Sequence, residues 1–383
     1  MRAANAIPPA LAWGEPGSRP TRIPDVMGAV RASLGLGETV PGCVFPQAKR
    51  AIVVLVDGMG WSQVGQRLAY ARSFLRGAWD SHEPIRTTLP STTASAITSL
   101  MCEAWPGATN MLGYEVVDPS FGPFTLITFT RRGTKTPVPT TGWNRVPTVF
   151  ERVAKAGGRA VAVAPARFAD SGLTLQALKG ASMRFAGSID ERVDAALAAS
   201  RDAQLTYLYF EHLDHVGHKN GWDSPAWLET LDAIDHALAQ LARRLPRDTL
   251  LVVTADHGMV NPDPASRVDL ATSPLATIPV TLGGEPRALH VHVDRGADVE
   301  AAQAAFADYL GEAAIVVGAE ELPRWIGPIA RPELAGDFWV FATGDTTVVD
   351  SRVHTPMAIA MKGVHGSVSD DETLIPLLVD CRD

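Results

Sequence analysis

Apolar residues along the chain fall into short continuous runs, and segments with helical spacing lie between them. The run at 50–56 reads Arg-Ala-Ile-Val-Val-Leu-Val, and similar runs occupy residues 205–210 and 250–254. Continuous β-branched apolar runs are typical of strands in a parallel sheet that is covered on both faces. A polar turn follows each run, at 57–60, 211–218 and 255–258. The pattern predicts buried strands whose polar turns gather at one edge of a sheet.

Helical spacing predicts helices at about residues 92–102, 147–157, 190–201 and 224–243. In the last of these, a period close to 3.6 residues relates five apolar positions: Leu228, Leu231, Ile234, Leu238 and Leu241. Strands that alternate with helices predict a doubly wound α/β fold, with a mostly parallel central sheet and helices on both faces. In such folds the ligand site lies beyond the carboxyl ends of the strands.

The remaining segments predict how the chain is divided. Residues 1–48 are rich in Pro and Gly and have little periodicity, so we expect an extended N-terminal arm. Strand patterns at 278–282, 288–293 and 314–317, with a helical pattern at 301–310, predict a small inserted α/β lobe of βαβ type at 270–330. The main domain would then comprise residues 49–269 and 331–383.

Composition excludes several classes of function. Apolar residues make up 46% of the chain and charged residues 20%, which is usual for a globular protein with a sizeable core. A net charge of -8 without a Lys/Arg cluster disfavours a nucleic-acid polymer as partner. Three scattered cysteines do not form a disulfide framework, and neither a signal peptide nor a membrane-spanning run is evident. These features predict a cytoplasmic protein with no membrane partner.

The polar turns, with one His-Gly turn near the C-terminus, contain an unusual set of carboxylates and imidazoles. The set is Asp57, Asp214, His218, Asp256, His257 and His365. Each residue alone would also suit a turn or a helix cap. Together they supply enough nitrogen and oxygen ligands for two divalent ions, with zinc the first expectation and manganese the second. Two such ions about 4 Å apart can stabilise the attacking and leaving oxygens of a phosphoryl transfer.

A nucleophile is expected in the Thr-rich segment 87–96. The residues after Thr92 are small and helix-compatible, so Thr92 would lie at a helix N-terminus. Free backbone N–H groups and the helix dipole favour an anion at that position. Coordination to a metal lowers the pKa of a hydroxyl and makes it a better nucleophile.

These motifs, in this order, resemble the alkaline phosphatase superfamily. The resemblance is strongest to its type I phosphodiesterase/nucleotide pyrophosphatase branch and extends from about residue 50 to residue 370. It implies that Asp214, His218 and His365 bind one ion. It also implies that Asp57, Asp256, His257 and the Thr92 oxygen bind the other, and that a phospho-threonine intermediate forms.

The chain departs from the resembled pattern in two places. Phosphodiesterases of this branch have a Thr followed by an aromatic residue, Pro and Asn, and that register would select Thr88 instead of Thr92. They also have an Asn after a His-Gly-Ile turn that stabilises the oxyanion. The corresponding stretch here is 109–114, so Asn110 or Tyr114 is the candidate for binding substrate. His212 and His215 lie outside the matched spacing and are interpreted as bystanders.

The resemblance implies hydrolysis of phosphodiester or phosphoanhydride bonds in a small phosphorylated substrate such as a nucleotide. A phosphomonoesterase or a phosphonate hydrolase would use the same metal set. A sulfatase is disfavoured, because the Cys/Ser-x-Pro-x-Arg context that its nucleophile needs is absent near Thr92. Outside enzymes, the alternative is a metal-dependent module that binds nucleotides or sugar phosphates without turnover.

Overall fold

The computed structural model describes residues 7–134 and 136–382. Its largest sheet has six strands in the order β17-β9-β1-β8-β6-β7. The strands are β1 (Arg50–Val56), β6 (Ala160–Ala164), β7 (Ser182–Phe185), β8 (Leu205–Phe210), β9 (Thr249–Thr254) and β17 (Leu377–Arg382). All neighbours in this sheet are parallel except β17, which runs antiparallel to β9. The predicted doubly wound α/β fold is confirmed.

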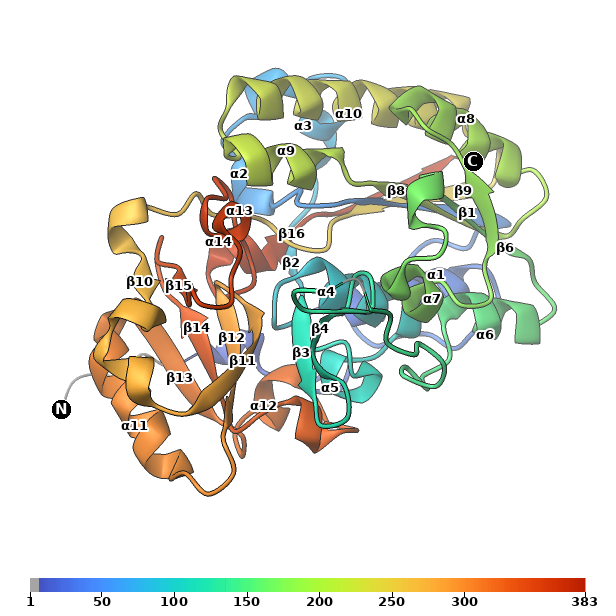
Figure 1. Cartoon of the computed structure of the whole chain (residues 1–383). Helices are drawn as coiled ribbons and strands as arrows, with labels where there is room; N and C mark the ends of the chain where they lie inside the picture. The colour runs from blue at the N-terminus through green and yellow to red at the C-terminus, as the bar shows by residue number, and fades with distance from the viewer. Residues whose placement is uncertain (1–6, 135, 383) are drawn as a thin grey trace.

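Helices cover both faces of this sheet (Figure 1). One layer holds α8 (Ile189–Ala199), α9 (His212–Asn220) and α10 (Pro225–Arg244). The other layer holds α1 (Ile23–Ser33), α4 (Thr93–Cys102), α6 (Val149–Lys155) and α7 (Gly172–Ala177). Because β1 lies between two layers, its residues 51–56 are fully buried, which accounts for its unbroken apolar sequence.

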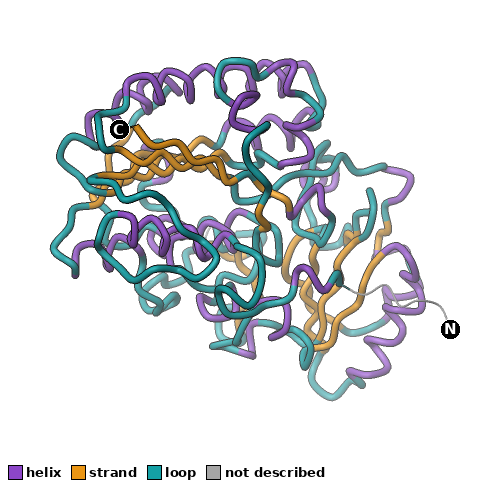
Figure 2. Tube along the Cα trace, turned by 180° about the vertical axis from the view of Figure 1, so that it is seen from behind, coloured by secondary structure: helices purple, strands orange, loops and turns teal. Residues whose placement is uncertain are grey.

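A second, antiparallel sheet lies beside the first (Figure 2). Its order is β11-β12-β14-β13, formed by β11 (Val280–Glu285), β12 (Ala288–Val293), β13 (Ala314–Gly318) and β14 (Phe338–Ala342). Helix α11 (Val299–Leu310) packs on it through Phe306 and Leu310. A shared apolar cluster, which includes Leu89, Phe124 and Trp339, joins this lobe to the main sheet's loops.

The remaining elements are short. A ribbon of β3 (Glu115–Asp118), β4 (Gly122–Thr125) and β5 (Thr130–Arg131) forms a separate sheet, and β2 (Ile85–Arg86) pairs with β16 (Leu374–Ile375). The strands β10 (Val268–Asp269) and β15 (Val348–Val349) also pair. The short helices are α2 (Trp61–Gly65), α3 (Leu75–Trp79), α5 (Pro106–Thr109), α12 (Pro323–Ile326), α13 (Pro356–Ile359) and α14 (Asp370–Thr373). Within the described residues, no helix is both long and apolar enough to cross a membrane.

Two expectations about the chain's division differ from the structure. The N-terminal stretch expected to be extended contains α1, whose residues Val26 and Val30 are fully buried. Pro and Gly residues on either side hid the helix, which starts where the Asp25 carboxylate accepts a hydrogen bond from the backbone N–H of Arg22. Residues 1–6 of that stretch lie outside the described residues.

The second difference concerns the inserted lobe. Its pairings are all antiparallel instead of βαβ, because β14 lies between β12 and β13. The lobe therefore extends past the boundary expected at residue 330. The sequence prediction missed β14 because its Phe-Trp-Val-Phe-Ala run follows the insertion and was assigned to the main domain.

A fully buried ion pair joins the lobe to the C-terminal segment. Arg287, in the turn between β11 and β12, contacts Glu372 of α14 through two N–H···O bonds of 3.0 and 2.6 Å, and both side chains are 0% exposed. Removing one partner of such a pair leaves a buried charge without compensation.

We therefore predict that Glu372→Ala lowers the free energy of unfolding by about 3–5 kcal/mol, measured by urea denaturation. The exposed pair Lys49–Asp248, with side chains 74% and 46% exposed, is the control. Lys49→Met should cost less than about 1 kcal/mol. If both substitutions lowered the free energy of unfolding by the same small amount, the buried pair would not stabilise the fold as predicted.

Candidate metal centre

The sheet brings the ends of three strands together. Strand β1 pairs with β8 on one side and with β9 on the other, in parallel. Asp57 follows β1, and Asp256 and His257 follow β9. Helix α9 begins two residues after β8 and carries Asp214 and His218. The predicted gathering of polar turns at one edge is therefore present.

Asp214, His218 and His365 form one group of potential ligand atoms, all within 4.8 Å of one another. Asp214 and His218 are four residues apart on α9, so they share one face of the helix. The Asp214 Oδ1 atom lies 3.3 Å from His218 Nε2 and 3.7 Å from His365 Nε2. His365 lies in the C-terminal segment. The next residue, Gly366, forms a backbone bridge with Ser91, which lies just before α4.

Asp57, Asp256 and His257 form the second group, again within 4.8 Å. His257 Nε2 lies 3.5 Å from Asp57 Oδ1 and 3.5 Å from Asp256 Oδ2. Asp57 and Asp256 each accept a hydrogen bond at one oxygen. The Tyr209 hydroxyl donates to Asp57 Oδ2, and the backbone N–H of Gly58 donates to Asp256 Oδ1. The other oxygen of each carboxylate faces the imidazole.

Backbone carbonyls orient all three imidazoles in the same way. The Nδ1 atoms of His218, His257 and His365 lie 2.8–3.0 Å from the carbonyl oxygens of Gly363, Gly258 and Ser91, respectively. A carbonyl can only accept, so each Nδ1 carries the proton and each Nε2 presents a lone pair. This is the tautomer that a metal ligand needs. The His257 and His365 rings stack at 3.6 Å between centroids, so the two groups are adjacent.

Three carboxylate oxygens in the two groups fit a bound cation. Asp57 Oδ1, Asp214 Oδ1 and Asp256 Oδ2 are buried without a hydrogen-bond partner. Orphaned buried polar atoms are rare and indicate a partner that hydrogen bonds do not supply. With three imidazole lone pairs they offer a mixed N/O donor set, which suits a borderline-soft divalent ion.

The electrostatics of the two groups also favour bound cations. Burial, then repulsion from Asp256 and Asp214, raises the pKa of Asp57 well above its usual range. Burial is also the main cause that raises the pKa of Asp256. Burial and the neighbouring His257 and His218 lower the pKa of His365 well below its usual value. Divalent cations would offset the repulsion among the carboxylates, and would favour the ionised acids and neutral imidazoles.

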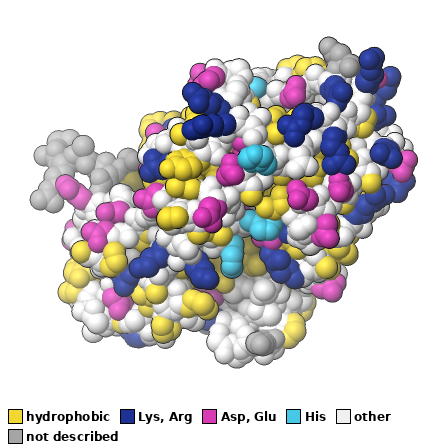
Figure 3. Space-filling view, turned by 90° about the horizontal axis from the view of Figure 1, so that it is seen from above, with side chains coloured by type: hydrophobic (Ala, Val, Ile, Leu, Met, Phe, Trp, Pro, Cys, Tyr) yellow, Lys and Arg dark blue, Asp and Glu magenta, His cyan; other side chains and the backbone are white. Residues whose placement is uncertain are grey.

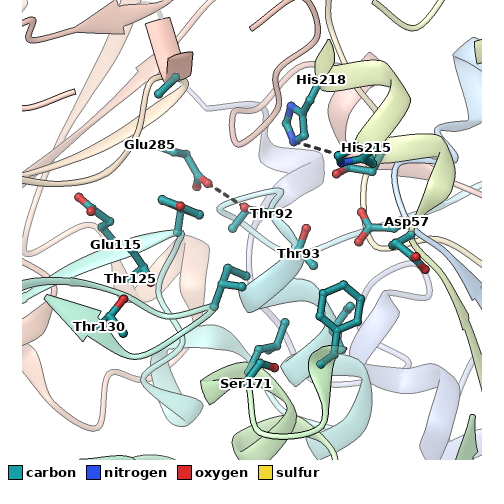
Figure 4. Close-up of a pocket in the computed structure, with 18 of the residues that line it drawn as sticks. Asp57, Thr92, Thr93, Glu115, Thr125, Thr130, Ser171, His215, His218 and Glu285 are labelled. Atoms are coloured by element: carbon teal, nitrogen blue, oxygen red, sulfur yellow. Dashed lines mark hydrogen bonds and ion pairs between the residues drawn. The ribbon is translucent and has the colours of Figure 1, made fainter. Parts of the chain in front are cut away.

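The Thr-rich segment begins α4, but one residue later than expected. Thr92 is the N-cap, with extended backbone angles, and α4 starts at Thr93. The Thr92 hydroxyl donates to Glu285 Oε2 at 2.7 Å and thus points away from both groups (Figure 4). The Thr93 Oγ1 atom lies 3.1 Å from His257 Nε2. The hydroxyl that faces the second group is therefore that of Thr93, which corrects the expected position of Thr92.

Of the other residues expected at the site, some line the cavity and some do not. Thr88 is fully buried and does not line the cavity beside the two groups. Asn110 is also absent from the lining, because its amide donates to the Trp143 carbonyl oxygen at 3.0 Å. Tyr114 lines the cavity and is 46% exposed. Of the two candidates for binding substrate, only Tyr114 reaches the site.

The cavity has a volume of about 880 Å³ and includes residues that sequence reasoning missed. Glu285, at the end of β11, lines it and is 7% exposed. Burial raises the pKa of this carboxyl from 4.5 to about 8. No motif marked Glu285, since only the antiparallel lobe brings it next to α4. His215, which the sequence analysis interpreted as a bystander, also lines the cavity. Histidine side chains gather near the middle of the face that is seen from above (Figure 3).

Comparison with known proteins agrees with this geometry. The sequence profile described as type I phosphodiesterase / nucleotide pyrophosphatase matches residues 51–367. The chain belongs to this family. The resemblance to the type I phosphodiesterase/nucleotide pyrophosphatase branch is thereby confirmed.

Curated relatives match this chain only locally. The human catalytic subunit of GPI ethanolamine phosphate transferase 3 is 37% identical over 89 residues, which cover 21% of this chain and 8% of the relative. Its mouse counterpart is 45% identical over 51 residues, 13% of this chain and 5% of the relative. The aligned parts thus span less than a tenth of either relative.

Solved structures share the fold over most of the chain. Murine ectonucleotide pyrophosphatase/phosphodiesterase 5, solved as an inactive variant with AMP, has a TM-score of 0.65 and 18% identity, covering 87% of this chain and 88% of its own. Phosphonoacetate hydrolase from Sinorhizobium meliloti, solved with phosphonoformate, has a TM-score of 0.69 and 18% identity, covering 90% and 93%. At these identities the likeness establishes the fold.

We predict that calorimetric titration of the metal-free protein with Zn²⁺ gives two ions per chain. Asp214→Asn and Asp256→Asn should each leave one site, because each removes a carboxylate from a different group. His236→Ala is the control, since this imidazole is 59% exposed on α10 and belongs to neither group. Two sites retained in both Asp variants would show that the ions bind elsewhere.

Proposed function

We propose that this protein hydrolyses phosphodiester or phosphoanhydride bonds of small phosphorylated substrates, with Thr93 as nucleophile and two divalent ions, zinc first. The observation that carries the proposal is the position of the Thr93 hydroxyl. It lies 3.1 Å from His257 Nε2, at the start of α4 and on the wall of the cavity. Family membership supports the reaction class.

The residues that would hold the ions are the two groups of three already described. Bound there, divalent ions would supply positive charge beside the transferred phosphoryl group and lower the pKa of a nearby hydroxyl. Thr93 would release its hydroxyl proton to solvent and attack phosphorus through Oγ1, while the bond from phosphorus to the leaving oxygen breaks and that oxygen takes up a proton from water. Water would then add to phosphorus, the bond to Oγ1 would break, and Thr93 would regain a proton.

The start of α4 would hold the phosphoryl oxygens during this transfer. The first N–H groups of a helix lack partners within the helix and point toward an anion. Thr93 is the first helical residue, so its side chain and these N–H groups face the same space. Tyr209 would keep Asp57 in place through its hydroxyl.

Family membership and the size of the cavity support a preference for diesters over monoesters. The cavity volume of about 880 Å³ leaves room for a second substituent on the phosphorus.

We predict that bis-p-nitrophenyl phosphate is hydrolysed with a higher kcat/KM than p-nitrophenyl phosphate, with Zn²⁺ or Mn²⁺. Phosphonoacetate in the same panel tests a phosphonate hydrolase. A clear monoester preference would reverse the assignment. Stoichiometric metal binding without turnover of any phosphorylated compound would favour a binding module instead.

We predict that Thr93→Ala lowers kcat by at least ~10³-fold while both ions stay bound. Thr92→Ala should retain most activity, because the Thr92 hydroxyl contacts Glu285 instead of either metal group. Acid quench during turnover, followed by mapping of the phosphopeptide, should locate the label on Thr93. Label on Thr92 or on Thr88 would move the nucleophile to that residue.

A further inference from the structure

The cavity beside the metal groups has one wall of apolar side chains. Six residues from three segments form this apolar wall: Ile97, Ile127, Phe168, Leu173, Ala177 and Leu178. They belong to α4, to the loop after β4, and to the stretch from the single helical turn Ala166–Phe168 to Leu178, the residue after α7. The chemistry of the metal groups does not account for this wall.

The apolar wall begins directly at the proposed nucleophile. Ile97 is four residues after Thr93 on α4, so the two side chains lie on one face of the helix. Phe168 lies 6.1 Å from the ring of Tyr209, whose hydroxyl contacts Asp57. The wall is therefore continuous with the second metal group, on the side of the cavity formed by α4 and α7.

The wall is also fixed in place. The backbone N–H of Leu173 donates to the Ile127 carbonyl oxygen at 3.0 Å, which ties α7 to the loop after β4. The polar side chains next to it, Ser171 and Thr174, bond each other at 3.0 Å. The Ser171 hydroxyl is thereby satisfied, because it also accepts from the backbone N–H of Thr174.

A nucleobase matches this wall poorly. Bases carry polar edges that cost free energy when buried without partners, and among the described lining residues there is no Asn or Gln. The Arg167 guanidinium, which pairs with Glu211, lies 4.6 Å from the centroid of the Phe168 ring and covers one of its faces.

We propose that the substrate is a phosphodiester in which one substituent is an apolar alkyl or aryl group that packs on the apolar wall. This inference rests on the proposed function and names the substrate class for that site. The phosphoryl group would lie at Thr93, and the apolar substituent would cover Ile97, Leu173 and Phe168.

The cavity is open to solvent, since Tyr114 and Val353 line it and are 46% and 37% exposed. A substituent longer than the wall would therefore reach solvent. The gain from each added methylene should fade once the substituent extends past the wall.

The test is a series of p-nitrophenyl alkyl phosphodiesters with methyl, propyl and hexyl groups, which share one leaving group. We expect kcat/KM of the wild-type protein to rise about two- to four-fold per buried methylene. Thymidine 5'-(p-nitrophenyl phosphate) should be a poorer substrate than the hexyl ester. A flat series, or a thymidine ester that exceeds the hexyl ester, would overturn the proposal.

Variants on α7 and α4 assign the effect to the wall. Leu173→Ser and Ile97→Thr should flatten the series, measured in each variant as the ratio of kcat/KM for the hexyl ester to that for the methyl ester. Leu175→Ser is the control, because Leu175 is 43% exposed on α7 and does not line the cavity. It should leave the slope unchanged, and an equal loss of slope in this variant would contradict the assignment. Ile97→Thr keeps a branched side chain, in case Leu173→Ser fails to fold.

A binding measurement separates this inference from the proposed function. If no diester is hydrolysed with either metal, the proposed function fails. Calorimetry with hexylphosphonate and methylphosphonate on the metal-loaded protein still tests the wall. We expect hexylphosphonate to bind at least about 10-fold tighter, and equal affinities would overturn the inference.

Discussion

Repulsion among three closely placed carboxylates, two of them fully buried, is the constraint on which this structure depends. Asp57 and Asp256 follow adjacent parallel strands, Asp214 lies on the helix after the third strand, and each has an oxygen without a hydrogen-bond partner. Divalent cations at the two groups would compensate the charge of these acids in their ionised form. Backbone carbonyls fix the three imidazoles so that their Nε2 atoms face the carboxylates. Local geometry and charge therefore both favour bound cations.

Two buried Arg–Glu pairs outside the site fix the segments that carry the metal-ligand residues. The buried Arg192 guanidinium binds Glu211, the residue before α9, which carries Asp214 and His218. On the other side, Glu372 accepts from the backbone N–H of Ser367, two residues after His365, while it binds Arg287. A buried Arg–Glu pair thus supports the segment behind each part of the first metal group. The inserted lobe contributes to the site through Arg287 and Glu285.

The sequence predicted most of the metal groups, because their residues follow strands with strong apolar runs. The core strands 50–56 and 205–210 and the helix α10 needed only local periodicity. The start of α4 could not be placed to the residue, since Thr92 and Thr93 are both good first-turn residues, and only tertiary contacts with Glu285 and His257 distinguish them. Helix α1 and strand β14 were missed because flanking Pro and Gly or an assumed boundary masked them. Glu285 has no local signal, since its role arises from a lobe remote in sequence.

The stacking of His257 on His365 has a consequence for how the protein matures during synthesis. Chains emerge from the ribosome in sequence order and fold domain by domain. Asp57, Asp256 and His257 are all present once residue 257 has emerged, whereas the first group waits for His365, which follows the whole inserted lobe. The ligands of the second group are therefore synthesised first, and the stack of His257 on His365 can form only after the whole inserted lobe has been made.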